Sequence, residues 1–470
     1  MQKIKSINWI FVFSIVLWCF VTLVRLFNHS PWYDEAHAWT IAQELNLIEI
    51  FRFMKTEGHT FLWYLFLMPF AKTNFAYPYS MLLLNWFFCF LSLIVLWRKA
   101  PFNNLIKFLI TFSFPFLALY SVIARCYAIG ILFLFVLISM DKEKLQYPNW
   151  YALFLVLLAN TSLMGIVPAT VLGIIFAVEM IKKKQKIALS FSIAIFGAVI
   201  ILLQLFGCVE SGLSIYSNND TLFKALARSI QYNTFYYWIA ISGISLISAI
   251  AFYIKNKKIP IFLVCSLVLL SGIFCVYAGR IWHLFFIYIF FVASCWLMLQ
   301  KENLCCKNLL NIALVITSVA CILYKPVVKD TDLVWRDNKM FLANEILKDE
   351  NLNNSTILIF RQFDTTIQPY LVDSNINLVN YCSGEKLNHN TMSYVNSKNC
   401  RLDMVLDSEL IALDKDIFDK WYNENLYLLT LNKLKMSNNE EISKKIGYNF
   451  VLYKDFGLNY LWKVEKIKDK

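Results

Sequence analysis

A series of long apolar runs fills the first 324 residues of this chain and constrains its fold more than any other feature. The runs are 15 to 22 residues long, and an α-helix needs about 20 mostly apolar residues to cross the hydrocarbon core of a bilayer. Eleven runs are present, at residues 9–27, 78–97, 105–122, 126–140, 149–164, 166–181, 187–206, 233–254, 259–278, 281–299 and 308–324. The sequence therefore predicts a polytopic α-helical membrane protein with about 11–12 spans.

The composition excludes most other classes of protein. Hydrophobic residues make up 59% of the 470 residues and charged residues 16%, whereas about a quarter of the residues of a soluble domain are charged. The chain is therefore too apolar to be disordered, collagen-like or a small disulfide scaffold. The first run is expected to remain as an uncleaved helix, because no small-residue cleavage site follows it.

Basic residues set the predicted orientation. Residues 1–324 contain 24 Lys and Arg against 11 Asp and Glu, and residues 325–470 contain 20 against 21. Lys and Arg in short connections between spans mark cytoplasmic loops, so this excess indicates a membrane topology and no nucleic-acid partner. The basic connections are 98–99, 141–144, 182–186, 255–258 and 301–307. We expect a multi-pass protein of the inner or plasma membrane with a cytoplasmic N-terminus.

The same orientation predicts two domains. Residues 1–324 form the transmembrane domain, with a first outside loop at 28–58 and a short apolar segment at 60–71 that is re-entrant or lies at the interface. Residues 325–470 contain no run long enough to cross a bilayer. Strands are predicted at 355–360, 425–431 and 450–453, and helices at 332–348 and 414–422. The tail is therefore expected to be a small extracytoplasmic α/β domain, in which Cys382 and Cys400 could form a disulfide.

Asp34 and Glu35 are the first candidate site residues. They follow the first span within a few residues, in a domain with few acidic side chains, and ionisable groups at membrane depth are costly and usually functional. The alternative is that one of them caps a helix that begins near Ala36.

Four further candidates are predicted to lie near the same outer face. His59 opens the short apolar segment, Arg125 lies in a nearly uncharged stretch, and Arg280 and His283 are three residues apart, so on a helix they share a face. A structural hydrogen bond would also explain His59, and snorkelling of the side chain would explain Arg125. Arginine can bind a phosphate through two parallel hydrogen bonds. The two arginines, the two histidines and the acidic pair therefore fit a site that holds an anionic lipid head group next to a carboxylate base.

These motifs resemble bacterial glycosyltransferases of the GT-C fold, in particular the dolichyl-phosphate-mannose protein mannosyltransferase-like and aminoarabinose-transferase-like group. The resemblance rests on the Asp-Glu pair after the first span, on the pattern EGH-x-x-LWY from Glu57, and on S-x-x-A-R-x-Y at Ser121–Tyr127. The group usually has a His-Pro-Pro-Leu element, where this chain has His59-Thr-Phe-Leu62.

The resemblance implies sugar transfer from a polyprenyl-phosphate-linked donor to a glycan, lipid or protein acceptor on the non-cytoplasmic face. It implies catalysis by Asp34 with Glu35 beside it, and contacts of Arg125 and Arg280 with the donor phosphate. His59, Tyr127 and His283 complete the set of predicted substrate-binding residues. No cofactor is implied. A divalent metal is possible but not expected, because two adjacent carboxylates are a small ligand set for Mg²⁺.

Three other functions remain open from the sequence. An oligosaccharide polymerase also handles polyprenyl-linked sugars outside the membrane. A transporter or flippase for lipid-linked sugars would use the arginines to select an anion, but is expected to place ionisable residues near the bilayer midplane and to show repeats. A non-enzymatic membrane scaffold would not need sparse charges concentrated on one face.

Overall fold

The computed structural model describes residues 8–57, 59–184, 188–205, 234–257, 260–276, 281–300, 306–324, 339–359, 361–381, 384–387, 415–423, 425–430, 443–444, 446–457 and 459–467. The chain forms two compact units. The first contains residues 1–28, 47–66 and 79–331, and the second contains residues 29–46, 67–78 and 332–470.

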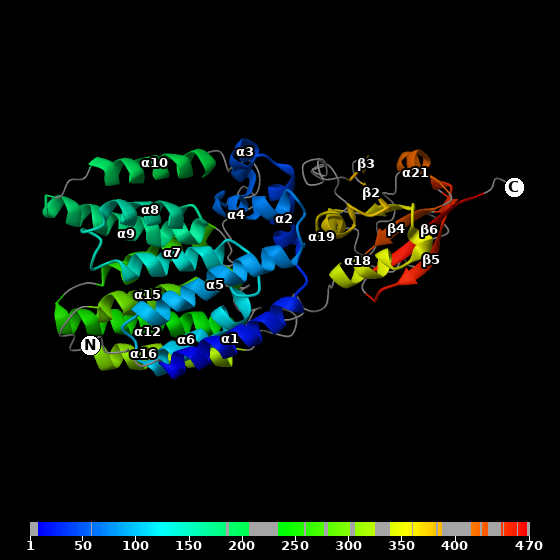
Figure 1. Cartoon of the computed structure of the whole chain (residues 1–470). Helices are drawn as coiled ribbons and strands as arrows, with labels where there is room; N and C mark the ends of the chain where they lie inside the picture. Colours follow the sequence, from blue (N-terminus) through cyan, green and yellow to red (C-terminus); the bar gives the residue numbers. More distant parts are fainter. Residues whose placement is uncertain are drawn as a thin grey trace, which may run out of the picture. The chain divides into compact units, whose positions relative to one another are not determined.

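The first unit is a bundle of apolar helices (Figure 1). Its helices are α1 (Trp9–Phe27), α3 (Leu47–Glu57), α5 (Tyr79–Lys99), α6 (Asn104–Thr111), α7 (Tyr127–Ser139), α8 (Pro148–Ala159), α9 (Leu163–Lys182), α10 (Ala188–Leu205), α12 (Thr234–Asn256), α13 (Ile261–Val276), α14 (Ile281–Leu284), α15 (Phe286–Leu299) and α16 (Lys307–Leu323). Helix α4 (Leu62–Ala71) begins in the first unit and ends in the second.

Five helical segments of the described residues are long and apolar enough to cross a membrane. They are α1, α5, α9, Tyr236–Asn256 within α12, and Ile281–Leu299, which combines α14 and α15. Six shorter apolar helices accompany them. The prediction of a largely helical, apolar protein is confirmed in this coarse form, whereas the number of spans and their orientation stay predictions.

The predicted span at 105–122 is wrong as a single helix. Helix α6 ends at Thr111, and a π-helical turn, η1 (Pro115–Leu119), follows before the chain becomes irregular. Pro115 has no N–H to continue the α-helical hydrogen bonds, and the Ser113 hydroxyl donates to the carbonyl of Ile110 at 2.7 Å. The eight residues of α6 extend over only about 12 Å, which is too short to cross a bilayer.

Polar side chains inside the apolar helices bond mostly within the bundle. On α1, the hydroxyls of Ser14 and Thr22 donate to backbone carbonyls one turn earlier, at 2.6 and 2.7 Å. On α10, Gln204 is buried and binds Asn160 at 3.1 Å, while its carbonyl accepts the Phe61 N–H at 2.8 Å. A buried polar group without such partners would cost several kcal/mol, on the order of 2–7.

The second unit contains a six-stranded mixed sheet with the order β3-β2-β1-β4-β6-β5. Its elements are β1 (Thr356–Ile359), β2 (Asn377–Asn380), β3 (Glu385–Lys386), β4 (Leu426–Thr430), β5 (Tyr448–Asp455), β6 (Tyr460–Lys466), the helices α2 (Tyr33–Glu44), α18 (Lys339–Leu347), α19 (Arg361–Leu371) and α21 (Lys415–Trp421), and the short turn η4 (Glu350–Leu352). Strands β2, β1 and β4 are parallel, and β3, β6 and β5 pair antiparallel.

Helices cover both faces of this sheet. One core joins α18 and α19 to the sheet through residues such as Ile346, Ile367 and Ile357. The other core joins α21 through Phe418, which packs with Leu428 and Trp462. The predicted α/β character of the tail is therefore seen, with β1, β4, β5, α18 and α21 at or near their predicted ranges, whereas α19, β2, β3 and β6 were not predicted.

Residues 29–46 and 67–78 belong with the tail to the second unit. Helix α2 packs against α19, and the side chain of Asn74 donates to Asp373 at 2.9 Å and to the carbonyl of Pro369 at 3.3 Å. Lys72 donates to the carbonyls of Gln43 and Leu45, both at 2.8 Å. The residues that carry the acidic pair are thereby held within the same unit as the sheet.

Candidate functional site

The acidic pair lies in the first turn of α2. The helix begins at Tyr33, three residues before the start near Ala36 that the sequence suggested, with Trp32 as its N-cap. Glu35 is fully buried, whereas Asp34 is half-buried. Glu35 therefore stands at the third helical position, from which a carboxylate reaches back to the cap.

Glu35 is held by two neighbours. Its Oε2 atom accepts the backbone N–H of Trp32 at 3.1 Å and lies 2.8 Å from Nε2 of His29. Negative charge in the first turn of a helix is also favoured by the helix dipole. These contacts give Glu35 a structural role at the start of α2, and they leave Asp34 as the more accessible carboxylate of the pair.

Arg125 and His59 form the polar centre of the first unit. Arg125 is only 8% exposed, and its Nη2 lies 3.1 Å from Nε2 of His59. A guanidinium group has donors and no acceptor, so Arg125 donates and His59 Nε2 accepts. Within this pair His59 is consequently the neutral tautomer, with its proton on Nδ1.

Glu57 and Tyr64 complete this group, which we call the Arg125 cluster (Glu57, His59, Tyr64 and Arg125). The hydroxyl of Tyr64 donates to Glu57 Oε2 at 3.3 Å, and it also interacts electrostatically with the charges of both Glu57 and Arg125. The cluster therefore combines a carboxylate, a guanidinium group, a neutral imidazole and a buried phenol. Such a set can bind an anion and can also accept a proton.

The loop that carries Arg125 is fixed to two helices. Tyr120 donates its hydroxyl to the carbonyl of Trp282 at 2.8 Å, and its own carbonyl accepts from Asn85 of α5 at 2.9 Å. The hydroxyl of Tyr127 lies 2.8 Å from Nε2 of His283, and both side chains are buried. These bonds connect the loop to α5 and α14 and fix the direction in which Arg125 can point.

Arg125 also stands directly before the N-terminus of α7. This helix begins at Tyr127, and the side chain of its N-cap residue, Cys126, makes no capping hydrogen bond. The first N–H groups of a helix and its dipole favour a negatively charged ligand. Arg125 and the N-terminus of α7 therefore both favour the binding of an anion, such as a phosphate, at this position.

The structure groups the predicted site residues into pairs. It brings His59 to Arg125 and Tyr127 to His283 in the first unit, and it places Asp34 and Glu35 in the second unit. Arg280, Cys382 and Cys400 lie outside the described residues. No group of three His, Cys, Asp or Glu side chains suited to a metal ion occurs in the part of the chain that the structure describes.

Three residues of these groups were not singled out from the sequence. Glu57 and Tyr64 belong to the EGH-x-x-LWY pattern, so their closeness to His59 in the chain was an available signal. His29 lies six residues before Glu35 and gave no such signal. Its contact depends on how the chain turns into α2.

The fold thus defines a helical protein that combines apolar helices, long enough in several cases to cross a bilayer, with a smaller α/β unit. The chain matches no family model, no curated protein and no solved structure.

Proposed function

We propose that the chain is an integral-membrane glycosyltransferase that moves a sugar from a polyprenyl-phosphate donor to an acceptor hydroxyl on the non-cytoplasmic face. The observation that carries this proposal is the buried Arg125, which pairs with His59 just before the N-terminus of α7. A cation kept among apolar helices is costly and commonly serves an ionic substrate. A lipid phosphate supplies the matching anion and reaches such a site from within the membrane.

In the proposed reaction, the acceptor oxygen attacks the anomeric carbon as the bond from that carbon to the phosphate oxygen breaks. The configuration inverts, and the acceptor proton passes to Asp34. Because a carboxylate is a weak base toward an alcohol, the proton moves late, as positive charge develops on the attacking oxygen. General-base assistance of this kind accelerates a reaction about 10²–10⁴-fold.

The phosphate leaves as a stable anion and needs electrostatic stabilisation, which guanidinium groups provide. Arg125 takes this role in the proposal, together with Arg280. The hydrogen bond between Tyr127 and His283 orients the loop before α7. Glu35 fixes the first turn of α2, where Asp34 is located.

The proposal includes a multi-pass placement with about 11–12 spans, a cytoplasmic N-terminus and an extracytoplasmic tail. The five long apolar helical segments and the six shorter ones support it.

The test compares envelope glycans, by mass spectrometry, from cells that express the wild-type chain or single variants at equal protein levels. We expect Asp34→Asn and Arg125→Ala to abolish one glycan modification. Glu143→Gln changes an exposed carboxylate near the predicted cytoplasmic face and should leave that modification intact. Unchanged glycans in both the Asp34 and the Arg125 variants would contradict sugar transfer by this chain.

A further variant tells the two candidate bases apart. Glu57 is the carboxylate of the Arg125 cluster, so it is the alternative proton acceptor. If Glu57→Gln abolishes the modification while Asp34→Asn retains it, the base is Glu57 and the role given to Asp34 is wrong.

A further inference from the structure

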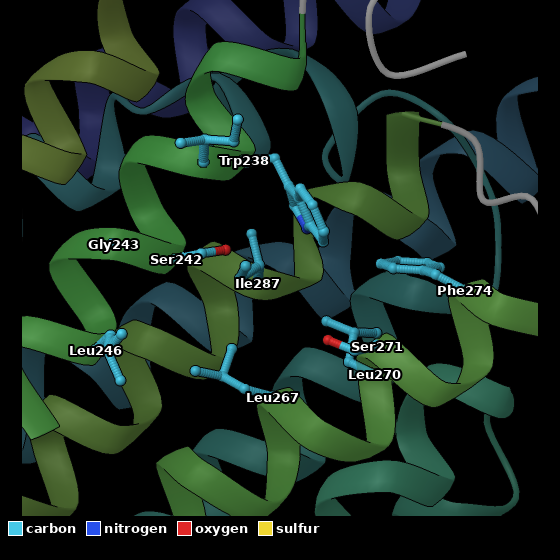
Figure 2. A pocket seen from close by; sticks show the side chains of 10 residues that line it. Trp238, Ser242, Gly243, Leu246, Leu267, Leu270, Ser271, Phe274 and Ile287 are labelled. Carbon is cyan, nitrogen blue, oxygen red and sulfur yellow. The ribbon is translucent and has the colours of Figure 1, made fainter. Parts of the chain in front are cut away.

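A pocket of about 410 Å³ lies between three helices of the first unit. Five of its lining residues come from α12, four from α13 and one from α15. Along α12 and along α13 the lining residues recur every three or four positions, so they lie on one side of each helix. Trp238 and Phe274 lie toward one end, and Leu246 and Leu267 toward the other (Figure 2).

The pocket opens on the outer surface of the helices. Its floor is formed by Leu270, Phe274 and Ile287, which are all buried, whereas Ile239 and Leu246 at its rim are 50% and 60% exposed. Helix α12 also contains one of the five segments able to cross a membrane. A ligand would therefore enter sideways, from the surroundings of the helices.

The lining has no charged residue, and Trp238, Ser242 and Ser271 are its only polar side chains. An ionised head group placed there would lose water without gaining a partner. A hydrocarbon chain has no such hydration to lose. Pockets that bind small ligands are usually mostly apolar and have volumes of about 300–1,000 Å³.

Two details refine the shape and the chemistry of the pocket. A Cβ atom added at Gly243 would meet no other atom within 4 Å, so the missing side chain leaves open space in the wall. The indole N–H of Trp238 is buried and has no hydrogen-bond partner among the described residues. Trp238 lies in the second turn of α12, near its predicted outer end, at the depth where lipid ester groups and tryptophan side chains meet.

We propose that this pocket holds one acyl chain of a bilayer glycerophospholipid. The ester carbonyl of the lipid accepts the Trp238 N–H, and the chain runs toward Leu246, along about 12 Å of α12. An isoprenoid phosphate has no carbonyl to accept this bond, so the pocket favours ester lipids. The inference rests on the membrane placement of the proposed function and is independent of its sugar chemistry.

The test uses the full-length protein in lipid nanodiscs that contain a phospholipid with a photoreactive group on one acyl chain. Mass spectrometry of the cross-linked peptides is expected to find α12 and α13 labelled at the pocket. Gly243→Leu should fill the open space and abolish this labelling. Gly272→Leu is the matched control, because a Cβ at Gly272 also meets nothing within 4 Å and Gly272 does not line the pocket.

Trp238→Phe tests the hydrogen bond. In the wild-type protein an unlabelled ester lipid should compete more strongly than its ether-linked analogue, and in Trp238→Phe the two should compete equally. Equal competition in the wild-type protein, or undiminished labelling of Gly243→Leu, would overturn the proposal. Displacement by polyprenyl phosphate at a concentration where phospholipid has no effect would overturn it as well, because the occupant would then be the donor.

The membrane placement is checked by alkaline extraction of membranes from cells that express the full-length protein. Release of the wild-type chain from the membrane would overturn the placement and the occupant together. Retention in the membrane with a failed pocket test would overturn the occupant alone and leave the proposed sugar transfer standing.

Discussion

Arg125 carries a positive charge where water is nearly excluded, and its surroundings explain how the fold tolerates it. Removing an ion from water costs several kcal/mol even after relaxation, of order 20 in the idealised limit. His59 accepts one hydrogen bond from the guanidinium group, and Tyr64 interacts with the charges of both Arg125 and Glu57. The positive charge of Arg125 is therefore partly compensated by the other residues of the Arg125 cluster, which also orient its side chain.

The neutral imidazole of His59 gives a prediction about Arg125. His59→Gln can still present a carbonyl oxygen to the guanidinium group, whereas His59→Lys places a second cation against it. We expect the lysine variant to lose about 10- to 100-fold in kcat/KM, the equivalent of a hydrogen bond to a charged group at about 1.5–3 kcal/mol. The glutamine variant should lose less, mainly through KM for the donor.

Steady-state transfer assays with a synthetic polyprenyl-phosphate sugar measure both constants. Equal losses in the two variants would show that His59 does not act through the charge of Arg125.

The two carboxylates of the acidic pair are expected to respond differently to substitution. Glu35→Ala leaves the Trp32 N–H without its acceptor and should destabilise the protein by about 1–3 kcal/mol. Asp34→Asn, in a half-buried position, should change stability by less than about 0.5 kcal/mol while it stops transfer. Thermal unfolding of the purified variants in detergent measures the difference. A Glu35→Ala variant of wild-type stability that lacks activity would instead place Glu35 in the chemistry.

At the scale of elements, the path of the chain between α6 and α7 decides where Arg125 is presented. Had residues 105–122 formed one helix, Arg125 would follow at its end without the fixed loop. The break at Ser113 and Pro115 and the turn η1 instead allow Tyr120 and Tyr127 to bond to α14. Backbone irregularity of this kind at the depth of apolar helices is tolerated where neighbouring helices enclose it.

The contact between β5 and α21 predicts a pH dependence in the second unit. Tyr448 is buried and donates its hydroxyl to Asp419 at 2.7 Å. Burial raises the pKa of the Tyr448 phenol well above its ordinary value, and the bond to Asp419 and the charge of that carboxylate raise it further. The fold therefore favours the neutral phenol over the phenolate.

Because the folded pKa is the higher one, the stabilisation is complete below about pH 10, the ordinary pKa of tyrosine, and is lost as the pH rises through the folded pKa. Tyr448→Phe should make the free energy of unfolding depend less on pH in this alkaline range. Chemical unfolding at a series of pH values measures this free energy. Tyr147→Phe, a change at an exposed tyrosine of the first unit, is the control. An unchanged alkaline dependence in Tyr448→Phe would contradict the assignment.

At the scale of the whole molecule, the charge distribution makes a prediction about topology. The connection 141–144 should be cytoplasmic and the α/β unit extracytoplasmic. In a variant without other reactive cysteines, Asn353→Cys should react with an impermeant reagent in intact cells, after permeabilisation of an outer membrane if the cell has one. Glu143→Cys should react only after the inner membrane is ruptured. Both positions are exposed, so the reverse pattern would invert the proposed orientation.

The sequence by itself determined the helical class and most helix positions. Apolar runs such as 9–27 and 78–97 correspond to α1 and α5 within a few residues, because a continuous apolar stretch satisfies its backbone best as a helix. It also identified Arg125 and the acidic pair, since charges are rare in this part of the chain. In the tail, β-prone stretches marked β1, β4 and β5, whereas β2 and β6 were not predicted, although β6 contains the β-prone sequence Tyr460-Leu-Trp-Lys-Val464.

Only the tertiary structure decided which of these residues meet. His59 and Arg125 are 66 positions apart, and Tyr127 and His283 are 156 apart, so their pairing depends on how helices pack and not on local pattern. The structure also grouped residues 29–46 with the tail and gave Glu35 the cap of α2. These outcomes follow from long-range packing and from the requirement that buried polar groups find partners, which no single stretch of sequence specifies.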